Sequence, residues 1–164
     1  MIVYHGTTMV LEKPDVAFSK DYLDFGKGFY VTIYQEQAER WALRKGIRKQ
    51  MPSYINIYEM ENDLTSYKVL SFGEENEKWL DFVCACRKGD KKYKNYDVII
   101  GNVADDDVFK TVNMYFRGIW TREKALEELR YYKLNNQICI VNQFVLEQIL
   151  TFQKAYEVKA GNDR

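Results

Sequence analysis

Short apolar runs with strand-like alternation are interspersed irregularly with longer runs of helical periodicity along this chain. Alternation at period two predicts strands, and apolar positions three and four residues apart predict helices. The order lacks the repeated strand–helix–strand units from which a doubly wound parallel sheet is built. The sequence therefore predicts an α+β fold.

The expected elements cover most of the chain, and Pro52 ends the first long helix because proline cannot continue one. Strands are expected at residues 2–4, 54–59, 67–72, 96–101, 137–141 and 152–158, and in the aromatic run after Gly28. Helices are expected at residues 35–49, 75–87, 106–116, 121–132 and 143–150. The apolar face of the first helix is expected to be Ala38, Trp41, Ala42 and Ile47.

Length and charge limit the class of protein. The 164 residues, 46% of them hydrophobic, suit one globular domain over residues 1–164. The 24 basic and 24 acidic residues cancel, so net charge gives no argument for binding nucleic acid or an anionic membrane. No export signal and no apolar run of spanning length is present. A cytoplasmic protein without a membrane partner is expected.

Cysteine and histidine usage points away from metal and disulfide chemistry. Cys84, Cys86 and Cys139 are odd in number, and the first two are separated by one residue, which fits neither a disulfide framework nor a zinc site. His5 is the single histidine, so no second one can complete a triad or a metal cluster. We expect no bound metal and three reduced thiols.

Two short motifs near the start carry the candidate chemistry. The first is Tyr4-His5-Gly6-Thr7 at the end of a predicted strand, and the second is the run FGKGFYVT at residues 25–32. Taken alone, the histidine would be a structural residue and the glycines an ordinary turn before a strand. The two motifs occur in this order and are followed by a helical run at residues 34–42.

Together these motifs resemble the NAD-binding core of the ADP-ribosyltransferase superfamily, in the diphtheria toxin and poly-ADP-ribose polymerase branch. The resemblance covers residues 2–42 and, less fully, residues 134–150. The whole chain resembles a small bacterial family placed in this superfamily. The resemblance implies a split, mixed β-sheet core with surrounding helices, and NAD bound between its two halves.

The resemblance also implies roles for residues of both motifs. His5 would hydrogen-bond a ribose of the adenosine half, and the backbone of Gly6 would bind the nicotinamide carboxamide, with Thr7 adding a hydroxyl. Glycine suits that position because a side chain would keep a planar ligand from the backbone. Tyr30 would stack on one face of the nicotinamide ring and Trp41 on the other, where a cationic ring is attracted to aromatic faces.

The second motif and a later strand complete the implied site. Gly28 would admit the ligand and Lys27 would contact a phosphate. Gln137 stands where active polymerases of this branch carry a glutamate, so the triad reads His5, Tyr30, Gln137. A glutamine carbonyl accepts a hydrogen bond but carries no charge and is not a base. We therefore expect mono-ADP-ribosylation or slow NAD hydrolysis rather than chain elongation.

Two charged runs have simpler explanations. Asp105, Asp106 and Asp107 suit the start of a helix, where carboxylates cap free amides. The basic residues at the end of the first helix could steer phosphates, but a solvated helix end beside the C-terminal dipole explains them more simply. This basic group consists of Arg44, Lys45, Arg48 and Lys49.

The predicted function is an NAD-dependent mono-ADP-ribosyltransferase that modifies a macromolecular acceptor. The neutral net charge of the chain favours a protein over a nucleic acid as this acceptor. By family analogy it is a toxin of a toxin–antitoxin or defence system, with an antitoxin as a further partner. Two alternatives stay open. One is a catalytically silent module that binds NAD or ADP-ribose, and the other is an interaction domain that uses its tyrosine-rich surface.

Overall fold

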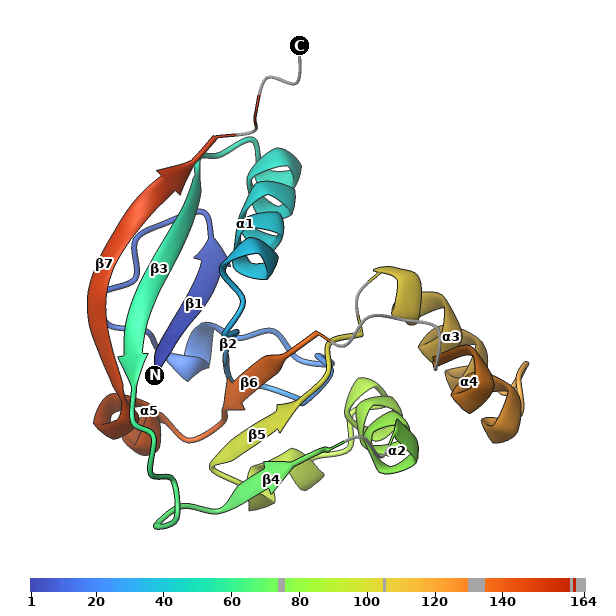
Figure 1. The fold of residues 1–164 in the computed structure, drawn as a ribbon. Helices are drawn as coiled ribbons and strands as arrows, with labels where there is room; N and C mark the ends of the chain where they lie inside the picture. The colour runs from blue at the N-terminus through green and yellow to red at the C-terminus, as the bar shows by residue number, and fades with distance from the viewer. Residues whose placement is uncertain (74–75, 105, 130–134, 160, 162–164) are drawn as a thin grey trace.

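The computed structural model describes residues 1–73, 76–104, 106–129, 135–159 and 161, and it contains two β-sheets with five α-helices around them (Figure 1). The first sheet is antiparallel, in the order β1 (Ile2–Thr7), β3 (Ser53–Met60), β7 (Leu150–Val158). The second is mixed, in the order β2 (Phe29–Val31), β6 (Gln137–Ile140), β5 (Val98–Gly101), β4 (Val69–Ser71). The predicted α+β class is confirmed.

The two sheets meet edge to edge at a single isolated bridge. The backbone of Tyr4 in β1 and that of Thr32, just after β2, exchange two hydrogen bonds of 2.8 and 3.0 Å. Apart from this bridge, and among the described residues, β1 pairs with β3 alone and β2 with β6 alone. We call this place the junction.

Helices cover the outer faces of both sheets, and a shared core lies on their other faces. The helix α1 (Gln35–Lys49) packs through Ala38 and Ala42 on Ile55 of the first sheet. On the second sheet, Cys139 and Ile99 belong to a cluster formed with three helices, α2 (Asn76–Arg87), α3 (Asp106–Phe116) and α4 (Arg122–Leu129). The shared core joins residues of both sheets with α5 (Gln143–Ile149) and includes Val3, Phe29, Val31, Tyr58, Val98 and Ile140.

Local chemistry explains how α1 begins and ends. Glu36 lies in its first turn and Arg48 and Lys49 in its last, which suits the helix dipole. Gln50 closes the helix in the left-handed region at φ 53°, where its amide reaches the carbonyls of the last turn. The expectation that Ile47 belongs to the buried face is wrong: its side chain is 75% exposed.

The observed elements follow the predicted ones within a few residues, with two additions. Short 3-10 helices occur at Val16–Phe18 and Lys92–Asn95. The first strand runs on to Thr7, so that His5 and Gly6 lie inside it. The predicted helix at residues 121–132 is described as far as Leu129, because residues 130–134 lie outside the described part.

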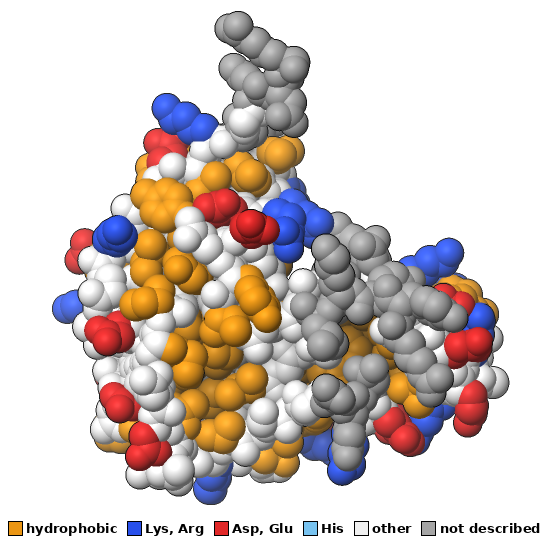
Figure 2. All heavy atoms as spheres, viewed as in Figure 1, with side chains coloured by type: hydrophobic (Ala, Val, Ile, Leu, Met, Phe, Trp, Pro, Cys, Tyr) orange, Lys and Arg blue, Asp and Glu red, His pale blue; other side chains and the backbone are white. Residues whose placement is uncertain are grey.

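Charged side chains of both signs are interspersed on the face in Figure 2, and hydrophobic side chains gather mainly over the side of the three-stranded sheet. This distribution fits a chain without net charge. No helix among the described residues is long and apolar enough to cross a membrane.

Candidate functional site at the junction of the two sheets

His5 crosses the junction with its side chain. Its Nδ1 lies 2.6 Å from the carbonyl oxygen of Tyr30, and its ring stacks on Phe29 with 4.5 Å between centroids. Because a carbonyl only accepts hydrogen bonds, Nδ1 carries the proton and Nε2 keeps its lone pair. Burial, helped by the charge of Lys45, lowers the pKa of His5 from 6.5 to about 3. The imidazole is therefore neutral at physiological pH, with Nε2 available as an acceptor.

The backbone amide and carbonyl of Gly6 face the side of β1 that carries the bridge to Thr32. Backbone groups of alternate residues in a strand point to the same side, and those of Tyr4 point toward Thr32 rather than β3. The amide and carbonyl of Gly6, two residues on, face that same side, and the carbonyl accepts a 2.8 Å hydrogen bond from Lys45 Nζ. These are backbone groups of the kind that bind a carboxamide.

Gly6 also has a packing reason to be glycine. A Cβ there would lie 2.0 Å from the carbonyl oxygen of Ala38 and 2.8 Å from the amide nitrogen of Ala42. The strand β1 therefore approaches α1 more closely than any side chain would allow. Ligand approach is not needed to explain this glycine.

Lys45 is a partly buried cation rather than part of a solvated helix end. Within the described part of the chain, its ammonium group has no carboxylate partner and donates to Gly6. Burial, followed by the nearby charges of Lys49, Arg48 and Lys20, lowers the pKa of Lys45 from 10.5 to about 8. The structure thus places an uncompensated positive charge beside the Gly6 carbonyl.

Gln37, Trp41 and Lys45 form one stripe of α1 at four-residue spacing, which runs from the residue before β6 to β1. Gln37 Nε2 donates a 2.8 Å hydrogen bond to the carbonyl of Asn136, and Lys45 reaches Gly6 at the other end. Trp41 lies between them and is partly buried. The side-chain oxygens of Gln37 and Asn136 are buried without a hydrogen-bond partner among the described residues. Such acceptors suit a ligand that brings donors.

Tyr30 is held by its own turn. Its hydroxyl donates to the carbonyl of Gly26 at 2.5 Å and accepts from the amide of Phe25 at 3.0 Å. Burial raises the pKa of Tyr30 well above 10, and Cys139 and Asp24 add to this shift. Neighbouring side chains in a strand point to opposite faces, so the Tyr30 ring packs with the Cys139 cluster while His5 stacks on Phe29. The imidazole meets the backbone of Tyr30 and not its ring.

The remaining candidates of the second motif have structural partners. The amide of Gly28 donates to Ser19 Oγ at 3.0 Å, and a Cβ on Gly28 would lie 2.5 Å from Cys139 Sγ. The backbone of Lys27 is hydrogen-bonded to Tyr93. Packing against β6 therefore accounts for Gly28. Thr7, the last candidate, ends β1 opposite Tyr54 and is partly buried.

Gln137 begins β6 and is 4% exposed. Its Nε2 lies 3.1 Å from Asp24 Oδ2 and 3.1 Å from the carbonyl oxygen of Asn102. Asp24 is also bound by Arg87 and by the amide of Ala104. Sequence reasoning missed Asp24, Asn102 and Arg87, which come from three separate segments and form no motif.

Family comparison adds one finding to this geometry. Residues 1–152 match the family described as "Protein of unknown function (DUF3990)". The chain belongs to this family. No curated protein and no solved structure matches the chain. The functional reading of this DUF3990 protein therefore rests on its residues and their arrangement.

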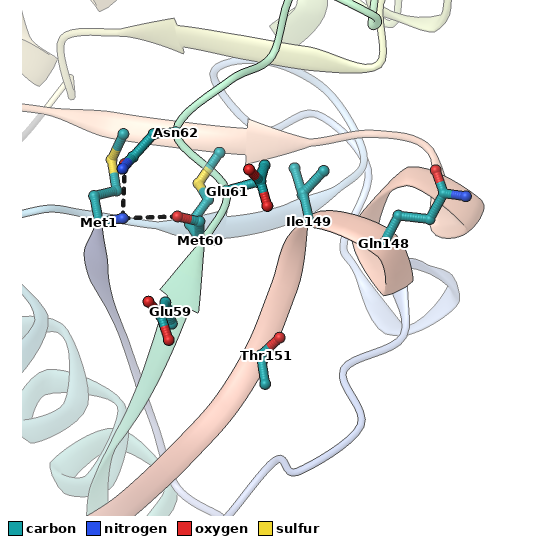
Figure 3. A pocket seen from close by; sticks show the side chains of 8 residues that line it. All are labelled: Met1, Glu59, Met60, Glu61, Asn62, Gln148, Ile149 and Thr151. Atoms are coloured by element: carbon teal, nitrogen blue, oxygen red, sulfur yellow. Dashed lines mark hydrogen bonds between the residues drawn. The ribbon is translucent and has the colours of Figure 1, made fainter.

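The DUF3990 protein also has a polar cavity of about 280 Å³, which lies at the end of the first sheet where Met1 precedes β1 and Met60 ends β3 (Figure 3). The amino group of Met1 closes one side through hydrogen bonds of 2.7 Å to the carbonyl of Met60 and 2.8 Å to Asn62 Oδ1. None of the sequence-predicted site residues lines it. The lining residues are Met1, Glu59, Met60, Glu61, Asn62, Gln148, Ile149 and Thr151.

Metal-ligand clusters, the thiol of Cys139 and the acidic run at residues 105–107 are the other candidates for chemistry. Among the described residues, no group of three or more His, Cys, Asp or Glu side chains is arranged to hold a metal ion. Cys139, in β6, is a free and buried thiol. The acidic run at residues 105–107 is expected to cap a helix. The helix α3 begins at Asp106, and Asp105 and the side chains of Asp106 and Asp107 lie outside the described part.

Proposed function

We propose that this DUF3990 protein binds NAD at the junction and transfers ADP-ribose to a macromolecular acceptor. The observation that carries the proposal is the succession of three strands. His5 in β1 hydrogen-bonds the backbone of Tyr30 in β2, and β2 pairs with β6, which Gln137 begins. The two sheets would form the split core of an ADP-ribosyltransferase-like fold.

Each of these groups has a physical task in the proposed complex. The neutral His5 accepts a ribose hydroxyl at Nε2, and the backbone of Gly6 pairs with the carboxamide. The uncharged ring of Tyr30 contributes to the apolar wall, and the carbonyl oxygen of Gln137 accepts from the reacting ribose. The Tyr30 ring packs against the cluster that contains Cys139, so in this proposal the apolar wall would lie on the helix-covered side of β2.

The proposed reaction breaks the glycosidic bond between the nicotinamide nitrogen and the ribose carbon. Nicotinamide leaves with the bonding electron pair, and positive charge develops on the ribose. A nucleophile of the acceptor then forms the new bond and loses its proton to solvent. Preorganised negative charge facing that ribose would contribute several kcal/mol. Gln137 supplies none, so we expect slow turnover.

Lys45 competes with NAD for one of these groups. Its ammonium occupies the Gly6 carbonyl that would accept from the carboxamide. Binding in the proposed pose therefore requires Lys45 to leave that oxygen. A ligand with phosphates would give the displaced ammonium an anionic partner, which it lacks among the described residues.

The test is nicotinamide release from labelled NAD by the purified protein, with and without cell lysate. His5→Phe keeps the ring stack on Phe29 and removes both nitrogens. The control Phe144→Ser changes a side chain on α5 that is 67% exposed. Loss of one hydrogen bond to the ribose is expected to reduce release by about tenfold in His5→Phe, with no change in the control. Equal release by all three proteins would contradict the proposed site.

A second candidate is a cytoplasmic module that binds NAD or ADP-ribose without turnover. The uncharged Gln137 favours it, because the residue that would face the reacting ribose then brings no charge opposite the developing cation. This module would show a thermal shift with NAD and no nicotinamide release. If release occurs and expression of the wild type arrests bacterial growth while His5→Phe does not, the toxin role and an antitoxin partner become the next question.

A further inference from the structure

The side-chain amide of Gln137 faces two groups that only accept hydrogen bonds. Asp24 Oδ2 and the carbonyl oxygen of Asn102 each lie 3.1 Å from its Nε2. A carboxylate and a carbonyl have no proton to give, so the NH2 end of the amide must lie toward them. Oε1 is thereby directed away from both.

Asp24 is itself fixed by contacts from two other segments. Arg87, at the end of α2, donates to Oδ1 from Nε at 3.1 Å and from Nη2 at 2.6 Å. The amide of Ala104 donates to Oδ2 at 3.0 Å. The side chains of Asp24 and Arg87 are only 12% and 17% exposed. A carboxylate with this set of donors cannot turn freely. Its Oδ2 therefore stays in position to accept from Gln137.

These surroundings fit a glutamine and disfavour a glutamate. A glutamate in the same position would bring a carboxylate oxygen against Asp24 Oδ2 and the Asn102 carbonyl, with no hydrogen between them. Two buried carboxylates at hydrogen-bond distance repel each other unless one takes up a proton. At position 137, where the superfamily resemblance implies a glutamate, the neighbouring groups therefore favour an amide side chain.

We propose that Asp24 is a positioning residue that orients the amide of Gln137, presents Oε1 to the reacting ribose and makes glutamine the residue that this site requires. The role of Oε1 toward ribose rests on the proposed function. The orientation of the amide and the intolerance of glutamate do not rest on it.

The first test is a double-mutant cycle on unfolding by urea, with wild type, Asp24→Asn, Gln137→Glu and the double variant. Gln137→Glu is expected to lower the urea midpoint more than Gln137→Met, which adds no charge. In the double variant the amide introduced at position 24 can donate to the new carboxylate, so at least half of the loss should be recovered. An equal loss in both backgrounds, or glutamate tolerated as well as glutamine, would overturn the inference.

A matched control comes from the other buried glutamine of the site. Gln37 also donates from Nε2 to a backbone carbonyl, that of Asn136, but among the described residues it makes no hydrogen bond to Asp24. Gln37→Glu should lower the urea midpoint to the same extent with and without Asp24→Asn. If Asp24→Asn also restored the urea midpoint of Gln37→Glu, it would act through net charge and not through Gln137, and the inference would fail.

The second test uses NAD. Nicotinamide release and the NAD thermal shift are expected to fall in Gln137→Glu and to recover in the double variant with Asp24→Asn. Release by Gln137→Glu above that of wild type would overturn the inference, since the site would then work better with a glutamate. If wild type neither shifts nor releases nicotinamide, the proposed function is wrong, and the urea cycle alone decides whether Asp24 holds the amide.

Discussion

Single residues at the junction show how burial changes the charge of a side chain. His5 and Lys45 both lie where water is largely excluded, and the pKa of each is lowered because the charged form loses its hydration. The effect leaves the imidazole neutral and the ammonium close to its titration point at mildly alkaline pH. Both consequences can be measured without knowing the ligand.

The protonation of His5 gives the first prediction. As the single histidine, it gives one unambiguous set of imidazole signals in nitrogen-15 NMR. We expect the neutral tautomer with the proton on Nδ1, because Nδ1 faces the carbonyl of Tyr30. With a folded pKa of about 3, the shifts should not change between pH 5 and 8. A titration near pH 6.5, or the tautomer protonated on Nε2, would contradict the geometry of the junction.

Lys45 gives a prediction about stability. Its pKa is about 8 in the folded state against 10.5 unfolded, so between these values the unfolded chain binds a proton that the native protein lacks. Stability must therefore rise with pH in that window and stay constant below it. Relative to Lys45→Met, the wild type should gain up to roughly 3 kcal/mol from pH 8 to 10.5, at about 1.4 kcal/mol per pKa unit.

The measurement is urea unfolding of the wild type and Lys45→Met at pH 7, 9 and 10. Tyrosine titrations are common to both proteins and cancel in the difference. A difference that stays flat across this range would mean that Lys45 is hydrated in the native state.

At the scale of elements, the contact between β1 and α1 places the site. The strand can lie against the helix because Gly6 has no side chain, and this closeness lets Lys45 reach the Gly6 carbonyl. Sequence periodicity predicted the bounds of α1, since the local pattern sets them. It misplaced Ile47 on the buried face, because Gly46 is the residue that packs on Ser53.

Gly6→Ala tests this contact. A Cβ would overlap the backbone of Ala38 and Ala42, which cannot move without displacing the helix. We expect a loss of at least about 2 kcal/mol in the free energy of unfolding. The control Gly73→Ala, where nothing lies within 4 Å of the added Cβ, should change stability by less than about 0.5 kcal/mol. Similar losses in both variants would show that β1 and α1 are not in close contact.

At the scale of the whole molecule, the second sheet and its helices enclose a core that holds all three cysteines. Cys84 and Cys86 on α2 belong to one cluster with Cys139 of β6. Burial raises the pKa of Cys84 to about 11 and that of Cys86 to about 12, and it also raises that of Cys139. Thiolate, the reactive form, is scarce as long as this core stays closed.

Thiol reactivity should therefore report opening of the molecule. With a disulfide reagent at pH 8, we expect all three thiols to react at once in 6 M urea. In the native protein they should react at one slow rate that increases with urea. One cysteine that reacts rapidly without denaturant would contradict the enclosed core.

The sequence by itself determined the order of the elements, the α+β class and the two motifs at the junction. These depend on neighbouring residues, such as the alternation in β3 or the ends of α1, and neighbours are visible in a sequence. It also singled out His5, Tyr30 and Gln137, although their assigned roles toward NAD stay a prediction.

Only the tertiary structure decided what those residues touch. Asp24 and Gln137 are 113 positions apart, and Lys45 and Gly6 are 39 apart. Neither pair has a local pattern, because their contact depends on how two sheets and α1 come together. The charge of a buried group likewise depends on what excludes water from it, and the packing of distant segments decides that.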